Sequence, residues 1–343
     1  MKKYRVAFAG LVHDHIWWYV PQWRALSGVE LVAAADPNRA LLRKARDEGV
    51  ARTYACYRQM LEREKIDILE VATSNAGAVE VVEAAAKCGI HIKIEKPMAA
   101  RLSQADRILA AARKARVQLM INWPTAWEPA TAQVLATIRR GDIGQPFYFR
   151  LRCAHRGPKE MGCSRYFWRW LYDEKENGAG ALMDYCCYGA AMCSDLFGLP
   201  RSVVGMRAVL AKTYPIPDDN AVILMRYDHL FGVAEASWTE QVEPHQPNPI
   251  CLGSRGNVGV LDGKVLFEPK GGRRRLTKPK PLRGGGRNSA EYFLTCLRKG
   301  QPIEGTCNPQ VSRNAQEILE AGLLSSNRGC EIRLPLGKSR GRR

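Results

Sequence analysis

The residues best placed for chemistry are a glutamate and a lysine at the end of a short apolar run. Alternating apolar residues predict a strand over 90–94, and Glu95, Lys96 and Pro97 follow it directly. Ligands of open parallel α/β sheets bind beyond the carboxyl ends of the strands, so Glu95 and Lys96 are placed for catalysis or binding. The alternative is a solvated ion pair at a turn, because surface pairs of this kind are common.

A second group of polar residues lies within 178–188, where glycines and alanines open a predicted helix. Asp184 and Tyr188 are four residues apart and therefore share one face of that helix. A carboxylate and a phenol on one face can reach the same substrate hydroxyl, Asp184 orienting it and Tyr188 exchanging its proton. The alternative is an exposed aspartate beside a half-buried tyrosine.

The first turn of the chain indicates a nucleotide site. Gly10 follows a predicted strand, Tyr4–Ala9, and precedes a predicted helix over 16–26. Dinucleotide-binding units place pyrophosphate on the N-terminus of such a helix, but this turn has only the first glycine of the G-x-G-x-x-G pattern. His13 and His15 either donate to phosphate and line the pocket, or cap the helix and face solvent.

Further polar residues follow the next strands. A predicted strand over 31–35 ends in Asp36, and an acidic residue there binds the ribose hydroxyls and repels a 2′-phosphate. The sequence therefore predicts NAD, with NADP less favoured, although Arg39 weakens the exclusion of NADP. Thr73 and Asn75 follow the next long strand and supply polar groups at the same edge.

These residues imply two domains in an α/β protein. Strands alternate with helices as far as Asn122, which predicts an N-terminal doubly wound parallel sheet of the Rossmann type over 1–123. Beyond it the predicted strands lengthen and follow one another. We expect a C-terminal α+β domain over 124–343, with an open, mostly antiparallel sheet.

Composition narrows the possible classes of protein. Of the 343 residues, 46% are hydrophobic and 25% charged, as in globular domains. No apolar run approaches the roughly 20 residues of a membrane helix, so we expect a cytoplasmic protein that does not bind membranes. Eleven cysteines without C-x-x-C spacing indicate reduced thiols and neither a disulfide framework nor a metal site.

The net charge of +18 raises the question of nucleic acid. Much of the excess lies in Lys270–Arg287 and Lys338–Arg343, where we expect loops or tails. Gly and Pro separate many of these charges and aromatic residues are absent, so the stacking component of single-strand binding is missing. The pattern predicts only weak attraction to polyanions and no specific nucleic-acid partner.

Together, these stretches resemble the Gfo/Idh/MocA family of nicotinamide-dependent oxidoreductases over nearly the whole chain. Glu95-Lys96-Pro97 stands at the family's E-K-P position, and 178–188 at its G-G-G-x-x-D-x-G-x-H/Y position. The resemblance implies that Lys96 lies beside the nicotinamide, that Asp184 and Tyr188 complete the site, and that a homodimer or homotetramer forms through the C-terminal sheet. It also places further residues along the cofactor, namely Thr73, Asn75, Trp168 and Arg169.

The chain departs from the family pattern in several positions. Val12 and His15 stand where glycine or alanine is usual, so the pyrophosphate contacts are expected to differ. Ala78 stands where many members have histidine. Tyr188 replaces the commoner histidine, as in the glucose–fructose oxidoreductase and dihydrodiol dehydrogenase branches, where a tyrosine is the acid/base.

The expected mechanism is hydride transfer between nicotinamide and a secondary hydroxyl of a sugar, cyclitol or related polyol. An ammonium beside a phenol favours the phenolate, so we expect the pKa of Tyr188 to fall below about 10. Tyr188 then accepts the hydroxyl proton while Lys96 steadies the alkoxide. The candidates for contact with other substrate groups are Asn122, His155, Arg156 and His245.

Two alternatives remain open. In one, the cofactor stays bound and a transient ketone drives redox-neutral glycoside cleavage. In the other, the protein is a dinucleotide-binding regulator without activity. Lys96, Asp184 and Tyr188 together argue against the regulator, because a sensor needs a nucleotide pocket but no acid/base pair.

Overall fold

A computed structural model describes residues 3–242 and 244–337, so the basic tail Lys338–Arg343 lies outside the described residues. The N-terminal half forms a six-stranded sheet in the order β3-β2-β1-β4-β5-β6, with every pair parallel. Its strands are β1 (Tyr4–Ala9), β2 (Val29–Ala35), β3 (Arg52–Tyr54), β4 (Ile68–Val71), β5 (His91–Glu95) and β6 (Leu119–Asn122). The doubly wound parallel sheet expected from the sequence is confirmed.

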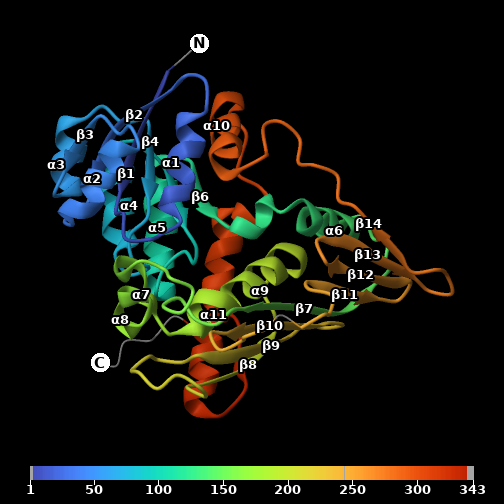
Figure 1. The fold of residues 1–343 in the computed structure, drawn as a ribbon. Coiled ribbons are helices and arrows are strands. Elements are labelled where there is room, and N and C mark those ends of the chain that lie inside the picture. The colour runs from blue at the N-terminus through green and yellow to red at the C-terminus, as the bar shows by residue number, and fades with distance from the viewer. Residues whose placement is uncertain (1–2, 243, 338–343) are drawn as a thin grey trace.

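Helices link these strands and cover the sheet (Figure 1). They are α1 (Ile16–Arg24), α2 (Arg39–Asp47), α3 (Tyr57–Arg63), α4 (Ala78–Lys87) and α5 (Leu102–Ala115). Each buries an apolar stripe, as Val79, Val82 and Ala86 do in α4. The carboxyl ends of the strands therefore face the second half of the chain.

A nine-stranded sheet forms the C-terminal half, in the order β14-β13-β12-β11-β7-β10-β9-β8-β15. Only β7 and β10 pair in parallel, so the expected mostly antiparallel sheet is confirmed. The strands are β7 (Pro146–Ala154), β8 (Ser202–Ala208), β9 (Asn220–Arg226), β10 (Phe231–Ser237), β11 (Ile250–Gly253), β12 (Gly256–Leu261), β13 (Lys264–Pro269), β14 (Arg275–Thr277) and β15 (Ile332–Arg333).

The helices of this half pack mainly on one face of the sheet (Figure 1). They are η1 (Pro124–Trp127), α6 (Pro129–Arg139), α7 (Arg165–Leu171), α8 (Glu174–Asn177), α9 (Ala181–Phe197), α10 (Ser289–Lys299), η2 (Gly305–Cys307) and α11 (Pro309–Arg328). Helix α9 lies against β7 and β10, and α11 packs on α9, β8 and α5, so α11 connects the two halves. No helix among the described residues is long and apolar enough to cross a membrane.

Two parts of the C-terminal half differ from expectation. Lys270–Arg287 was expected to be a loop, yet it contains the short strand β14, which pairs antiparallel with β13 so that Leu276 lies opposite Leu266. Helix α10 was not expected, and it returns to the first sheet, where Ser289 contacts Gln22 and Arg298 donates to the carbonyl of Ser27. We propose that the domain boundary lies after residue 123. Helix α10 belongs to the second half of the sequence but packs on α1 of the first half.

Candidate active site

Lys96 lies at the carboxyl end of β5 and reaches across to the second half of the chain. Its peptide bond with Pro97 is cis, and its side chain is 2% exposed. The Nζ atom donates to Asp184 Oδ1 at 2.6 Å and to the Asp184 carbonyl at 3.2 Å. Asp184 lies in the first turn of α9, where the helix N-terminus stabilises a carboxylate. The two motifs found in the sequence are therefore joined by one buried ion pair.

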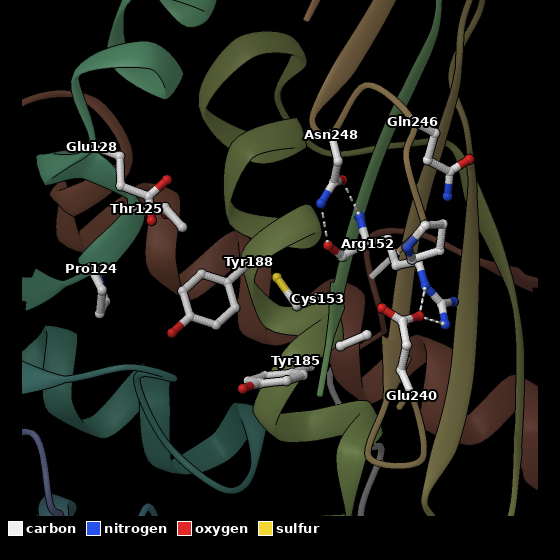
Figure 2. A pocket seen from close by; sticks show the side chains of 12 residues that line it. Pro124, Thr125, Glu128, Arg152, Cys153, Tyr185, Tyr188, Glu240, Gln246 and Asn248 are labelled. Atoms are coloured by element: carbon white, nitrogen blue, oxygen red, sulfur yellow. Dashed lines mark hydrogen bonds and ion pairs between the residues drawn. The ribbon is translucent and has the colours of Figure 1, made fainter. Parts of the chain in front are cut away.

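Tyr188 lies one helical turn beyond Asp184 and lines a cavity. The Lys96 Nζ atom is 5.0 Å from the centre of the Tyr188 ring, and Tyr185 is also within reach at 5.9 Å. Figure 2 shows the hydroxyls of Tyr185 and Tyr188 directed to the same side of α9. The amine, the carboxylate and the phenol thus lie in one cluster.

The protonation of this cluster differs from expectation. Burial, together with the nearby Cys187 and the charge of Asp184, raises the pKa of Tyr188 well above its ordinary value. Burial opposes the charge of Lys96, but Asp184 outweighs it and raises the pKa of Lys96. The expected fall in the pKa of Tyr188 is wrong for this arrangement, because burial disfavours the phenolate and the neighbouring Cys187 and Asp184 act in the same direction.

The cavity beside Tyr188 has a volume of about 300 Å³, near the lower end of the ~300–1,000 Å³ of small-molecule sites. It lies where η1, β7, α9 and the loop 238–249 meet (Figure 2). Its lining residues are Pro124, Thr125, Glu128, Arg152, Cys153, Ala154, Tyr185, Tyr188, Glu240, Pro244, Gln246 and Asn248. The hydroxyl of Thr125 is buried without a hydrogen-bond partner among the described residues. Polar groups therefore surround the space that Tyr188 faces.

The turn after β1 fits a dinucleotide. Gly10 has φ +77°, and a Cβ there would lie 2.5 Å from Thr73 Cγ2, so only glycine allows this turn to sit on the end of β4. The amides of Val12 and Asp14 have no partner among the described residues and lie at the start of α1. Free amides at a helix N-terminus are donors for a phosphate.

Asp36 follows β2 and is 2% exposed. Its Oδ2 accepts from the amide of Leu11 at 2.7 Å, and its Oδ1 accepts from the amide and side chain of Asn38. The carboxylate therefore fixes the nucleotide turn as well as standing at the ribose position. Arg39 begins α2 and is exposed.

The two histidines of the turn converge on Glu95. His15 Nδ1 lies 3.1 Å from Glu95 Oε2, and His13 Nε2 lies 3.7 Å from the same oxygen. Two histidines and a carboxylate form a ligand set for a transition metal. However, His13 Nδ1 accepts from the amide of His15, which places the ring proton on Nε2 and leaves that atom no lone pair for a metal. His13 Nε2 itself is buried without a hydrogen-bond partner among the described residues, because its 3.7 Å distance to Glu95 is too long for a hydrogen bond.

Burial lowers the pKa of His13 well below its ordinary value, so the ring is neutral. Burial acts to raise the pKa of Glu95, but the hydrogen bond and charge of His15 outweigh it, and the pKa of Glu95 is lowered. Glu95 is therefore an anion held between the nucleotide turn and Lys96. Asn122 supports it by donating to Oε1 at 2.6 Å.

A segment at 164–177, which includes α7 and α8, ties the two halves together above this edge. Asp14 accepts from the amide and hydroxyl of Ser164 at 2.7 and 2.6 Å. Ser74 donates to Glu176 at 2.5 Å. Asn75 donates to Asn177 at 2.8 Å, so the predicted cofactor residue Asn75 is engaged within the protein.

The other residues predicted along the cofactor lie near the same edge. Thr73 packs against Gly10, and its hydroxyl donates to the Ser74 carbonyl. Trp168 is half-buried against Tyr172, while the neighbouring Arg169 is exposed. Their contact with a nucleotide stays a prediction.

None of the four predicted substrate residues lines the cavity, and three of them lie away from it or are engaged within the protein. Asn122 is fully buried, with its amide bonded to Glu95 and its oxygen accepting from Trp127 at 2.9 Å, so it is a positioning residue. His245 is exposed and pairs with Asp262 at 3.3 Å. Arg156 is exposed as well. The structure therefore supports none of these three as a substrate contact.

His155 lies nearer the site. Its ring packs edge-on against Tyr185 with centroids 4.8 Å apart, and its Nδ1 accepts from the amide of Gly157. Burial lowers the pKa of His155, so it is neutral. His155 packs against Tyr185 but is absent from the cavity lining.

Several lining residues were not predicted from the sequence. Glu128 drew notice only as the residue before Pro129, and Tyr185 only as the neighbour of Asp184. Tyr185 directly follows Asp184 near the start of the helix, and this position was the available signal for it. Arg152 and Glu240 are 88 residues apart, and only the folded sheet brings them together.

Comparisons with known proteins agree with this geometry. Residues 6–123 match the family described as oxidoreductase family, NAD-binding Rossmann fold, and residues 131–258 match the GFO/IDH/MocA C-terminal domain. D-apiose dehydrogenase of Paraburkholderia graminis is 35% identical to this chain over the matched region. That region covers 38% of this chain and about a third (35%) of the length of the D-apiose dehydrogenase. Trans-1,2-dihydrobenzene-1,2-diol dehydrogenase of Xenopus tropicalis is 25% identical over 79% of this chain and 82% of its own.

Solved structures share the fold at low identity. Levoglucosan dehydrogenase, in complex with NADH and levoglucosan, has a TM-score of 0.82 at 18% identity, covering 98% of this chain and 100% of its own. The WlbA dehydrogenase from Bordetella pertussis, in complex with NADH and UDP-GlcNAcA, has a TM-score of 0.79 at 21% identity, covering 98% and 99%. Since the two matched families span both halves of the chain, the protein belongs to the GFO/IDH/MocA family of oxidoreductases.

Proposed function

We propose that the protein is an NAD(H)-dependent oxidoreductase that transfers hydride between nicotinamide and a secondary hydroxyl of a sugar, cyclitol or related polyol. The observation that carries this proposal is the Lys96–Asp184 pair at 2.6 Å beside Tyr188, at the mouth of a polar cavity. The names of the relatives, among them D-apiose dehydrogenase, support a hydroxyl as the reacting group.

The residues that would hold the nucleotide are those of the first sheet's carboxyl edge. The amides of Val12 and Asp14 suit its pyrophosphate, and Asp36 suits an unphosphorylated ribose, which favours NAD over NADP. When bound, the nicotinamide supplies or accepts the hydride. Lys96 and Glu95, at the end of β5, would border the nicotinamide end.

Within the cluster, Tyr188 is the proton carrier. Its raised pKa keeps the phenol protonated at neutral pH, so it is ready to donate to the oxygen of a carbonyl substrate. Lys96, charged and held by Asp184, orients the substrate oxygen and stabilises negative charge on it. In the oxidation direction the same phenol must first lose its proton, which becomes easier as the pH rises.

A redox-neutral glycosidase is the second candidate. In that reaction a hydride would pass from the carbon of a sugar hydroxyl to bound NAD and return to the ketone after the glycosidic group has left and water has added. The same residues would transfer the protons and stabilise the charge on oxygen. The segment 164–177, which is hydrogen-bonded over the nucleotide turn, favours a cofactor that stays bound through such a cycle.

One experiment separates these candidates. Native mass spectrometry of the purified protein tests for bound nucleotide, and a panel of sugars, cyclitols and aryl glycosides is then followed for both NADH absorbance and aglycone release. Net NADH formation or consumption supports the dehydrogenase, while aglycone release without net NADH supports the glycosidase. Failure of NAD to bind, with no turnover in either assay, would overturn both.

We also propose that two or more copies associate through the open face of the C-terminal sheet. Val204, Met206 and Leu224 are exposed apolar side chains on adjacent strands of that face. Val204 and Leu224 lie directly opposite each other across β8 and β9. Light scattering of the full chain tests this, and a monomer at micromolar concentration would contradict it.

A further inference from the structure

The guanidinium of Arg152 is the only cationic side chain in the described lining of the cavity beside Tyr188. Two carboxylates already bind this guanidinium. Glu240 Oε2 accepts from Nε at 2.8 Å and from Nη2 at 2.5 Å, and Glu235 accepts from Nη1 at 3.3 Å. A free guanidinium binds a carboxylate or phosphate with two parallel hydrogen bonds. Three of the five N–H donors of Arg152 are thus bound to carboxylates, and its Nε–Nη2 edge is occupied by Glu240.

The remaining charges in and around the cavity are negative. Glu128 is exposed on the opposite wall, so Glu128, Glu235 and Glu240 oppose the single charge of Arg152. Lys96 and Asp184 form an ion pair, so together they add no net charge to this balance. An anionic substrate group would therefore meet excess negative charge in a small cavity.

A second arginine lies nearby, and its positive charge offsets the negative charge of Glu235, which is likewise absent from the cavity lining. Within the described lining, Glu128 and Glu240 still outnumber the single cation Arg152. Arg150 lies two residues before Arg152 on β7, but it is absent from the cavity lining. Its Nη2 atom donates to the carbonyl of Pro247 at 3.4 Å, beneath the loop that covers this end of the strand.

The same walls suit hydroxyl groups. Carboxylate oxygens of Glu128 and Glu240 are acceptors for hydroxyl protons, and the buried Thr125 hydroxyl has no partner among the described residues. Tyr185 adds a phenol on the side of Tyr188 (Figure 2). Several acceptors and small donors around about 300 Å³ match a compact ligand with many hydroxyls.

The wall that carries Glu240 is fixed by the backbone of β7. Asn248 accepts from the amide of Arg152 at 2.8 Å and donates to its carbonyl at 2.7 Å, as a paired strand would. The loop from Glu240 to Asn248 is thus anchored at both ends on one residue. Glu240 is held at Arg152 and cannot swing away without breaking the pair.

The fold alone leaves the charge of the substrate open. Levoglucosan, an uncharged anhydrosugar, and UDP-GlcNAcA, an anionic sugar nucleotide, occupy structures that share this fold at TM-scores of 0.82 and 0.79. The side chains that line the cavity of each protein must therefore determine whether a charged or an uncharged substrate binds.

We propose that this cavity selects uncharged polyols of monosaccharide size against carboxylated or phosphorylated sugars, and that Glu240 is the specificity-determining residue because it occupies Arg152. This inference rests on the proposed function. It predicts that release of Arg152 creates a site for a substrate carboxylate.

The test compares matched pairs of substrates, D-glucose with D-glucuronate and D-galactose with D-galacturonate, in the wild type and in Glu240→Gln. We expect the wild type to favour the neutral member of a pair, and Glu240→Gln to raise the uronate-to-neutral ratio of kcat/KM by about 10-fold or more. Glu235→Gln is the matched control. It removes one contact at 3.3 Å and should shift the ratio less.

A double variant, Arg152→Gln with Glu240→Gln, should lose the gain, which shows that the released guanidinium carries it. Thermal melting of each variant checks that it is folded. A wild type that prefers uronates, or an unchanged ratio in folded Glu240→Gln, would overturn the inference and leave the oxidoreductase proposal standing. Absence of wild-type turnover with any pair would count instead against the proposed function.

Discussion

Two buried lysine–carboxylate pairs lie three residues apart on the same strand, and they have different consequences. Lys93 Nζ donates to Glu70 at 2.5 Å, with both side chains fully buried between β5, β4 and α1. Lys96 Nζ donates to Asp184 at 2.6 Å, almost as deeply buried, but across the junction of the two halves and beside a cavity. The chemistry of the two pairs is nearly the same, so position along the strand determines what each can do.

The surroundings of the first pair are closed. The second oxygen of Glu70 accepts from Trp23 at 2.8 Å, and Lys93 lies 4.0 Å from the centre of the Tyr19 ring. Burial raises the pKa of Glu70 despite its partner, which shows how costly the isolated charge is. Lys93 and Glu70 stabilise the packing of α1 on the sheet and face no ligand.

The largest expected effect is on turnover, at Lys96. Lys96→Met should reduce kcat by about 10³-fold, because it removes the cation that orients the substrate oxygen and leaves Asp184 unpaired. NAD binding, followed by quenching of protein fluorescence, should persist. A rate close to wild type would place Lys96 in the same structural role as Lys93.

Lys93→Met should act on stability instead. It leaves the carboxylate of Glu70 buried without its cation, and we expect about 3–5 kcal/mol less free energy of unfolding in urea. The double variant Lys93→Met with Glu70→Leu should recover most of this loss, because no buried charge remains. A large fall in kcat of the folded single variant would show that the two pairs are not separate in function.

Tyr188→Phe sharpens the comparison by removing only the phenol that accompanies the active pair. We expect kcat to fall by about 10²-fold with little change in melting temperature.

The wild-type rate of alcohol oxidation should rise with pH to beyond pH 10 or so, since burial raises the pKa of Tyr188 above about 10 and only the phenolate accepts the proton. Carbonyl reduction should be flat below that pH. An oxidation rate that levels off near pH 7 would show that bound nucleotide, or another group, sets the titration.

The smallest effect is expected at a third buried carboxylate, Asp36, whose partners are neutral N–H groups. Asp36→Asn keeps an acceptor for the amide of Leu11 but loses the charge at the ribose position. NAD affinity should fall by about 10-fold, and the preference for NAD over NADP should narrow by a similar factor. Direct titration with both nucleotides measures this, and a wild type that prefers NADP would refute the role of Asp36.

The sequence predicted the parts of the fold that depend on local pattern. The strand over 90–94 and the polar residues after it were recognisable because apolar alternation ends where the ligand edge begins. That Asp184 and Tyr188 share a helix face followed from their spacing, and the family resemblance placed Lys96 in the same site, but the ion pair between Lys96 and Asp184 was not predicted. These signals need few residues and little knowledge of distant contacts.

Other features depend on distant contacts and were missed. The burial of Lys93 could not be read from its strand, because its cation is satisfied only by Glu70 on the neighbouring strand. The direction of the Tyr188 pKa shift was mistaken for a similar reason, since the burial that raises this pKa comes from packing between segments far apart in the chain. The strands β11–β14 are three to six residues long, so each of them gave little periodic signal.

The hydrogen bonds from Asp14, Ser74 and Asn75 to the segment 164–177 bear on how the protein would be handled in the laboratory. They join the rim of the nucleotide turn to α7 and α8, and a dinucleotide seated between them could leave only after several of them had parted. We therefore expect preparations to retain nucleotide through dialysis. Assays begun without removing it would report the carried-over cofactor and not the one that was added.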